Sequence, residues 1–312
     1  MKLLRLVPDK TNLRFMSWRR VSYPFTAFVA IASIALFLTV GLNYGIDFKG
    51  GSLIEIKTTD GPANIGEIRG KLGDLNLGDI QVQEFGSPEE VLIRIEHQGD
   101  ADADQQEVLT NVRQALGENV EFRRTEIVGP RVSGELAQAG IMAVGGALVL
   151  ILFYIWIRFE WHFAVGAILT TLNDIIVTIG LFSLLQLDFT LSSIAAVLTI
   201  LGYSLNDTVV VYDRVRENLR RYKKLPLDEL LDRSINETLA RTVNTSLTTL
   251  LALFALYIFG GEVIQSFVLA MIFGVVIGTY SSVFLACPFL IMLKLRPSAF
   301  RKEEDDNKAI QA

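Results

Sequence analysis

Long runs of apolar residues alternate with polar segments along this chain. Six runs are long enough to cross a bilayer, at residues 21–42, 136–157, 163–187, 189–212, 242–259 and 263–293, because a membrane helix needs about 20 predominantly apolar residues. The sixth run exceeds this length, which predicts a tilted helix or one that extends past the membrane. The first run is too long for a signal peptide, so we expect an uncleaved helix. The pattern predicts a polytopic α-helical membrane protein.

A polar segment, residues 45–133, separates the first two spans. Strand patterns at Gly51–Thr58, Ile80–Phe85, 91–96 and Val120–Val128 are interspersed with helical spacing at 64–75 and Asp102–Leu116. The resulting order, βαββαβ, is that of a ferredoxin-like domain. We therefore expect a small α+β domain, with a core of its own, between the first and second membrane helices.

Basic residues gather in three segments that an even number of spans places on one side of the membrane. They are Lys2, Arg5, Lys10, Arg14, Arg19 and Arg20, then Arg214, Arg216, Arg220, Arg221, Lys223 and Lys224, and finally Lys294, Arg296, Arg301 and Lys302. Because Lys and Arg are enriched in cytoplasmic loops, both termini should be cytoplasmic. The predicted organisation is a leader (1–20), a first helix (21–44), a domain outside the cytoplasm (45–133), helices two to six (134–293, with a cytoplasmic loop at 213–240) and a tail (294–312).

Composition and motifs point away from enzymatic chemistry. The chain is 51% hydrophobic and 20% charged, and its single cysteine, Cys287, excludes an internal disulfide. Two histidines, His97 and His162, are too few and too far apart to suggest a metal cluster. A P-loop, a dinucleotide fingerprint, a Ser/His/Asp order and a zinc-protease helix are all missing from the sequence. We expect a transport protein that is not an enzyme, with no cofactor, no metal and no nucleic-acid partner.

Two acidic residues inside the spans are the strongest functional candidates. Asp174 lies in the third span and Asp207 in the fourth, and each follows an asparagine, Asn173 or Asn206. A charged side chain at the bilayer centre costs about 2.5–3.5 kcal/mol on insertion scales and usually has a functional role. The alternative, for both acids, is a polar contact that only holds helices together.

Arg241 opens the fifth span and begins a polar stripe along it. Arg241, Thr245, Thr248 and Thr249 share one helical face with Ala252, and Asn244 adds to it. This stripe should face the bundle interior or a wetted crevice. We hypothesise that Arg241 approaches Asp207 and favours the charged carboxylate, and that separation favours protonation. Arg241 could instead be an ordinary arginine at the cytoplasmic interface.

Small residues, a proline and a charged helix complete the pattern. Residues at intervals of four let helices approach closely, and they form two ladders: Ala139, Ala143 and Ala147, then Ala270, Gly274, Gly278 and Ser282. Pro288 should kink or terminate the regular part of the last helix. The run 213–218 after the fourth span favours a solvated helix at the membrane end.

These residues carry a resemblance that covers nearly the whole chain. The sequence resembles the SecF family of protein-export membrane proteins, which belong with SecD to the RND superfamily. The matching stretches are GIDFKGG (45–51), VGP (128–130), GEL (134–136), GYSLNDTVV (202–210), DRVREN (213–218), RT (241–242), TS (245–246), TT (248–249) and FGG (259–261). One departure is Asn173, where relatives often have histidine, and it weakens a relay role for that position.

The resemblance implies a fold, a function and a set of partners. The fold would be a six-helix RND-like half-bundle with a periplasmic ferredoxin-like domain, in the bacterial inner membrane. The chain would pair with SecD, associate with the SecYEG translocon, other Sec accessory subunits and membrane lipid, and couple the proton-motive force to late export of preproteins. Asp207 and Arg241, with Asn206 and Asp174, would form the proton pathway.

Two other functions remain open at this point. One is a stand-alone RND-type exporter of small molecules, which would have to act as a homodimer because this chain holds one six-helix half. The other is a passive assembly scaffold, in which Asp207 is only structural. A stable SecD partner would distinguish the first from protein export, and a neutral replacement of Asp207 would distinguish the second.

Overall fold

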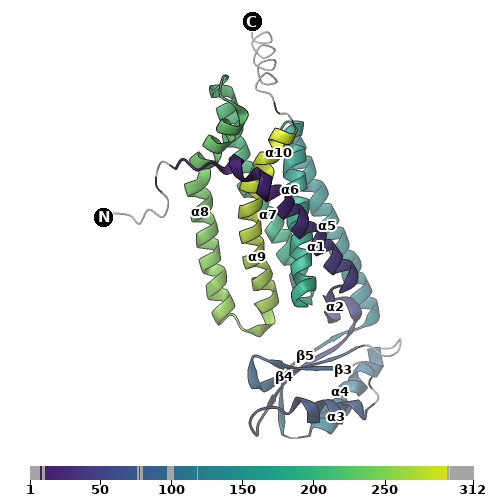
Figure 1. The fold of residues 1–312 in the computed structure, drawn as a ribbon. Coiled ribbons are helices and arrows are strands. Elements are labelled where there is room, and N and C mark those ends of the chain that lie inside the picture. Colours follow the sequence, from purple (N-terminus) through teal and green to yellow (C-terminus); the bar gives the residue numbers. More distant parts are fainter. Residues whose placement is uncertain are drawn as a thin grey trace.

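The structure, a computed structural model, has a helical bundle with a small α+β domain at one end (Figure 1). It describes residues 8, 11–75, 77, 80–96, 102–117, 119–293 and 295. Several residues of the sequence predictions lie outside the described residues. These are Lys2, Arg5 and Lys10 of the leader, His97, and the tail residues Lys294, Arg296, Arg301 and Lys302.

Within the described residues, six helical segments are long and apolar enough to cross a membrane, which confirms the expected number. They are α1 (Arg19–Thr39, after the 3-10 turn η1, Phe15–Trp18), α5 (Pro130–Arg158), α6 (Trp161–Leu185), α7 (Leu191–Arg221), α8 (Leu227–Phe259) and a composite last helix. The last follows a short 3-10 turn, η2 (Glu262–Ile264), and consists of α9 (Gln265–Ser281), a π-helical turn η3 (Ser282–Ala286) and α10 (Cys287–Met292).

The stretch predicted as a loop, 213–240, is mostly helical. The helix α7 continues to Arg221 and α8 begins at Leu227, so only residues 222–226 separate them. Ion pairs support this extension, since Arg214 on α7 contacts Glu237 on α8 at 2.7 Å and Glu217 at 2.5 Å. The charged run therefore extends both helices beyond their apolar parts, as the solvated-helix interpretation expected for 213–218.

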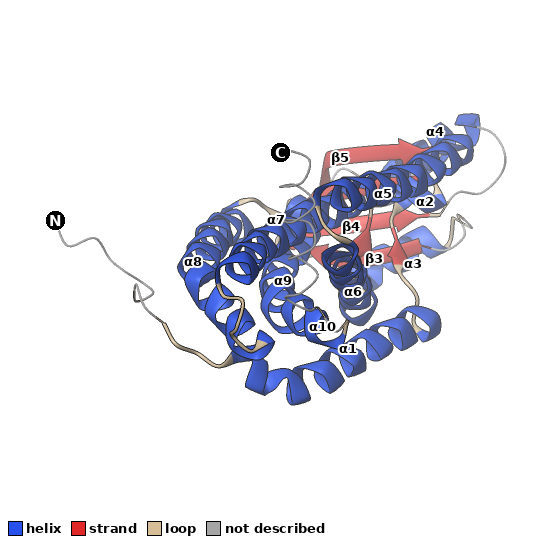
Figure 2. Ribbon diagram, turned by 90° about the horizontal axis from the view of Figure 1, so that it is seen from above, coloured by secondary structure: helices blue, strands red, loops and turns tan. Residues whose placement is uncertain are grey.

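The bundle has inner and outer helices. In α6, α7 and the α9–α10 helix, half of the residues in the apolar 18-residue stretch are buried. In α1, α5 and α8 the buried share is 11–17%. Viewed from above, α9 lies between α8 and α6 (Figure 2). The outer helices present large apolar side chains such as Phe28, 70% exposed, and Trp156, 80% exposed. Such surfaces suit contact with lipid or with another membrane protein.

The two small-residue ladders differ in use. Gly274 and Gly278 of α9 face α7, because a Cβ at these positions would lie 2.3 Å from Ile200 and 3.0 Å from Ser204. Ala139 and Ala143 of α5, by contrast, are exposed. Of the two ladders, the one in the last helix is therefore the one that packs closely against a neighbouring helix.

The inserted domain, from β2 to β5, has the predicted ferredoxin-like arrangement. Its strands are β2 (Gly51–Thr58), β3 (Ile80–Phe85), β4 (Ser87–Ile95) and β5 (Val120–Val128), in the antiparallel order β3-β4-β2-β5. The helices α3 (Ile65–Gly73) and α4 (Asp102–Leu116) lie on the face away from the bundle (Figure 1). Apolar residues at alternate strand positions form the core with these helices, including Ile54, Ile56, Val91, Ile93, Leu72 and Val112.

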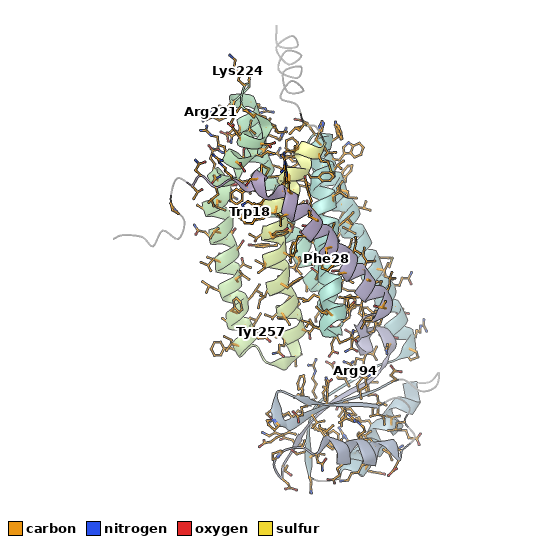
Figure 3. The ribbon with its side chains drawn as sticks, in the orientation of Figure 1. Trp18, Phe28, Arg94, Arg221, Lys224 and Tyr257 are labelled. Atoms are coloured by element: carbon orange, nitrogen blue, oxygen red, sulfur yellow. The ribbon has the colours of Figure 1, made fainter. Side chains whose placement is uncertain are left out.

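A short segment joins the bundle to the inserted domain. It contains β1 (Asn43–Tyr44) and a four-residue helix, α2 (Ile46–Lys49). The strand β1 pairs in parallel with β6 (Asp188–Phe189), which lies between α6 and α7. At the opposite end of the bundle lie basic residues, among them Arg221 and Lys224 (Figure 3).

Candidate functional site

Asp207 lies on α7, where three membrane helices meet. One carboxylate oxygen, Oδ1, accepts a hydrogen bond from Thr242 of α8 at 2.6 Å, and the other, Oδ2, accepts one from Ser282 of η3 at 2.5 Å. The residue is only 8% exposed. Hydroxyl donors therefore offset part of the cost of removing a carboxylate from water.

Asp174 lies on α6 and has a similar environment. Its Oδ2 accepts hydrogen bonds from Ser204 of α7 at 2.5 Å and Ser281 of α9 at 2.9 Å, and its Oδ1 accepts a longer one, 3.4 Å, from Asn173. The side chain is fully buried. Ser281 and Ser282 are consecutive residues, so one short segment of the last helix contacts both intramembrane acids.

The two adjacent serines reach two helices because consecutive residues of a helix point about 100° apart, and a π-helical turn begins at the second serine. A π-turn widens a helix locally and is frequent at functional sites. Pro288 follows this turn and cannot donate a backbone hydrogen bond to the preceding turn. The carbonyl oxygen of Ala286, within the turn, accepts a hydrogen bond from the buried Tyr212 hydroxyl at 2.9 Å. The kink expected at Pro288 therefore takes the form of a change in helix type just before it.

A layer of hydroxyl groups lies one helical turn closer to the inserted domain than Asp207. Tyr203 of α7 donates a hydrogen bond to Ser246 of α8 at 3.0 Å, and Ser246 is 2.7 Å from the hydroxyl of Thr279 on α9. These residues connect α7 and α8 with α9, the part of the last helix directly before η3. The layer therefore adds hydrogen bonds between these helices on the side of the acid that faces the inserted domain.

Arg241 and Asn206 are placed differently from the acids. Both side chains are exposed on the surface of the single chain. Among the described residues, no hydrogen bond or ion pair within 4.0 Å joins Arg241 to Asp207; the contact is made by the next residue, Thr242. The structure therefore brings Asp207, Thr242 and Ser282 together, and places Arg241 at the edge of this group.

The polar stripe of α8 faces outward rather than into the bundle. Arg241, Asn244, Thr245 and Thr248 are exposed, whereas Thr242 and Ser246 are the buried hydroxyls. Helical spacing identifies which residues share a face but not the direction of that face. An exposed polar stripe on a membrane helix needs a polar environment, either water or another protein.

Sequence reasoning did not find the donors to the two acids. Thr242 and Ser204 occur in the matching stretches, but neither was assigned a contact, and Ser282 was interpreted as a packing residue. The available signal was the Ser-Ser pair six residues before Pro288, on a helix otherwise rich in apolar and small residues. Which side chains these two serines contact depends on how the helices pack against one another.

Comparison with known proteins identifies the family. Residues 108–296 match the family described as protein export membrane protein SecD/SecF, C-terminal, and residues 35–61 match the SecD/SecF GG motif. A SecF subunit of the protein translocase from Rhodobacter capsulatus is 44% identical over 97% of this chain and 95% of its own length. The corresponding protein of Rickettsia akari is 42% identical over 99% of this chain and 98% of its own.

The chain belongs to the SecF family of protein translocase subunits.

Three further matches are to longer SecDF proteins. A translocase subunit SecDF of Brucella abortus is 43% identical over 99% of this chain, which spans 40% of that protein. The crystal structure of SecDF from Thermus thermophilus matches with a TM-score of 0.83 and 35% identity, over 93% of this chain and 40% of that one. SecDF in a super-membrane-facing form matches with a TM-score of 0.67 and 34% identity, over 99% and 41%.

Membership of the SecF family places the chain among membrane transport proteins. The relatives are membrane transport components rather than classical enzymes, and they do not support the alternative of a small-molecule exporter. The GG-motif match includes the stretch 45–51 at the domain junction, and the C-terminal match includes Asp174, Asp207 and Arg241. Both the junction and the acids thus lie in segments shared with the family.

Proposed function

We propose that this chain works with a SecD partner as a proton-driven subunit of the protein-export machinery. In this proposal it associates with the SecYEG translocon and other Sec accessory subunits, and assists late export of preproteins across the bacterial inner membrane. Asp207 binds and releases the proton, Arg241 is its alternating countercharge, and Asn206 and Asp174 belong to the same pathway.

The observation that carries the proposal is the environment of Asp207. Its carboxylate lies between α7, α8 and η3, in contact with hydroxyl groups. Protonation removes the charge and changes which of these groups can donate to the carboxyl group. A change in protonation therefore acts directly on the contacts that join three membrane helices.

The membrane gradient can supply the energy for such a cycle. One elementary charge that crosses 100 mV releases about 2.3 kcal/mol. Hydrogen bonds to a charged group contribute about 1.5–3 kcal/mol each, and Asp207 accepts two. The energy of one proton is therefore comparable to that of one of these two contacts.

The proposed orientation places the basic end of the bundle in the cytoplasm. Arg221, Lys223 and Lys224 lie at the end opposite the inserted domain, as the positive-inside rule requires for cytoplasmic termini. The inserted domain then lies in the periplasm, where it can contact an emerging preprotein.

A SecD partner also accounts for the exposed polar stripe of α8. SecD and SecF occur in one chain in the SecDF relatives. A second bundle against α8 would shield Arg241, Asn244 and Thr248 from lipid. The same contact would cover the edge of the Asp207 site.

The decisive experiment is Asp207→Asn in membrane vesicles that contain the chain with SecD and SecYEG. The variant keeps the size of the side chain but cannot exchange a proton. The gradient-dependent part of preprotein secretion should fall at least about tenfold, since about 1.4 kcal/mol corresponds to a factor of ten. Asp60→Asn, on an exposed turn of the inserted domain, is the matched control. Undiminished gradient-dependent secretion in Asp207→Asn would instead support a passive scaffold.

A further inference from the structure

The open face of the inserted domain's sheet carries a buried arginine that points toward the bundle. Arg94 of β4 is 8% exposed, and Figure 3 shows it at the boundary between domain and bundle. Its NH2 group is 2.9 Å from Oδ1 of Asp188 in β6, and its NH1 group donates to Oδ1 of Asn43 at 3.4 Å. Asn43 donates in turn to Asp188 at 2.8 Å. Three chain segments therefore meet at one ion pair, which is well shielded on the arginine side.

Backbone pairing reinforces this contact. Asn43 and Tyr44 pair with Asp188 and Phe189, and the amide of Gly45 donates to the carbonyl of Phe189 at 2.9 Å. A Cβ at Gly45 would lie 2.8 Å from the Thr190 side chain, so the close approach requires glycine here. The junction is thus fixed both by main chain and by side chains.

An aspartate of the same junction holds the first residue of α7. The carboxylate of Asp47 accepts a hydrogen bond from the amide of Leu191 at 2.8 Å. A negative charge at a helix N-terminus is favourable, because the first amides have no partner within the helix. Asp207 lies on the same helix, sixteen residues or about 24 Å further along.

A crevice of about 280 Å³ begins at this junction and extends between the sheet and the α8–α9 turn. Asp47, Arg94 and Asp188 line one part of it, and elsewhere Leu53 and Phe85 of the sheet line it together with Val263 and Phe267 near the start of α9. The sheet is therefore bonded to the N-terminus of α7 but lies across a gap from the α8–α9 turn. Asp207 lies at the boundary between these two parts, bonded to α8 and η3.

We propose that residues 43–51, Arg94 and Asp188 form a joint that fixes the inserted domain to α7, so that domain and α7 move together against α8 and α9. This gives the GIDFKGG stretch a mechanical role: Asp47 and Arg94 are positioning residues that link the domain to the helix carrying Asp207. The inference rests on the proposed function only for its consequence in export, not for the joint itself.

Distances between spin labels in the full chain, reconstituted with SecD, test the joint directly. One label replaces the exposed Glu121 of β5, and the second replaces the exposed Ala195 of α7 or Phe259 of α8; the buried Cys287 stays in place. The 121–195 distance should be narrowly distributed and identical in the wild type and in Asp207→Asn. The 121–259 distance should differ between these two proteins. Equal shifts of both distances would contradict the proposal.

Substitutions at the joint provide the second arm. Asp47→Ala and Arg94→Ala should broaden the 121–195 distribution, whereas Asp47→Asn, which keeps the acceptor for Leu191, should not. Arg123→Ala removes an ion pair with Glu90 elsewhere on the sheet and is the matched control. A narrow distribution in both alanine variants would overturn the joint.

Secretion assays on the same variants separate the joint from the proposed function. Thr190 remains the N-cap of α7 in Asp47→Ala, so this variant loses only the hydrogen bond from Leu191. A loss of about 1 kcal/mol corresponds to about a fivefold change in an equilibrium, so gradient-dependent secretion in Asp47→Ala should fall about fivefold, with recovery in Asp47→Asn. Wild-type secretion in Asp47→Ala would contradict the mechanical role. Intact secretion in Asp207→Asn would refute the proposed function, while the label distances would still decide whether the joint exists.

Discussion

At the scale of single residues, glycines set how closely the membrane helices approach. Gly180 of α6 faces Ser33 of α1, and a Cβ at this position would lie 2.3 Å from the Ser33 side chain and 2.8 Å from its Cα. The second distance involves backbone, so a rotamer change cannot relieve the clash. Only a shift of α1 away from α6 can do so.

Gly180→Ala should therefore lower the free energy of unfolding by about 1–3 kcal/mol, the usual cost of overpacking. Gly202→Ala on α7 is the control, because an added Cβ there meets nothing within 4 Å and alanine improves helix propensity by about 1 kcal/mol. Thermal unfolding in detergent measures both. Equal melting temperatures for the two variants would contradict the contact between α1 and α6.

At the scale of elements, the π-helical turn η3 is the feature on which the site depends. It begins at Ser282 and directly follows Ser281, so the two donors that the last helix supplies to the acids lie at its start. Tyr212 stabilises the turn through the carbonyl oxygen of Ala286. A buried carbonyl that loses its donor costs about 1–3 kcal/mol.

Tyr212→Phe should destabilise the chain by about this amount and should also reduce gradient-dependent secretion. Tyr154→Phe, on a side chain that is 49% exposed, is the matched control and should have neither effect. Chemical unfolding in detergent and the vesicle secretion assay give the two readouts. A loss of stability without any loss of secretion would show that the geometry of η3 does not affect proton-driven secretion.

At the scale of the whole molecule, the single chain leaves one polar face without a partner in the membrane. The exposed residues Arg241, Asn244, Thr245 and Thr248 follow one side of α8. Exposed residues on α5, such as Leu150, are apolar and suit lipid. The outer helices α5 and α8 therefore have different expected neighbours.

A bulky substitution distinguishes these two surfaces. Thr248→Trp should reduce the amount of SecD that copurifies by about tenfold, which corresponds to a loss of about 1.4 kcal/mol. Leu150→Trp on α5 should leave it unchanged, since the side chain there is 69% exposed and apolar. If Leu150→Trp has the larger effect, the SecD contact lies on the other side of the bundle.

Local patterns account for the parts of the fold that sequence predicted well. In the inserted domain, β2, β3, β5 and α4 have the predicted bounds, because alternation with period two and helical spacing depend on neighbouring residues alone. The positions of Asp174 and Asp207 within spans followed from composition. Asn64, predicted as the first residue of a helix, is the N-cap of α3 and accepts a hydrogen bond from the amide of Glu67.

The remaining features depend on contacts between distant segments. Ser282 lies 75 positions from Asp207 and Ser281 lies 107 positions from Asp174. Ser204, the other serine that bonds to Asp174, belongs to the next span, 30 positions away. The outward direction of the α8 stripe depends on how α8 packs, which a periodicity cannot give. The Asp47 contact with Leu191 joins residues 144 positions apart.

The connection between β5 and α5 has a consequence for the order in which the protein is made. A single residue, Gly129, separates the last strand from α5. The central strand β2 pairs with β5, so the sheet is complete only when β5 has been made. None of its strands lies after residue 128. Because domains fold as units during synthesis, this sheet can close while the ribosome is still translating the five later spans. Those helices then assemble next to an inserted domain that has already folded.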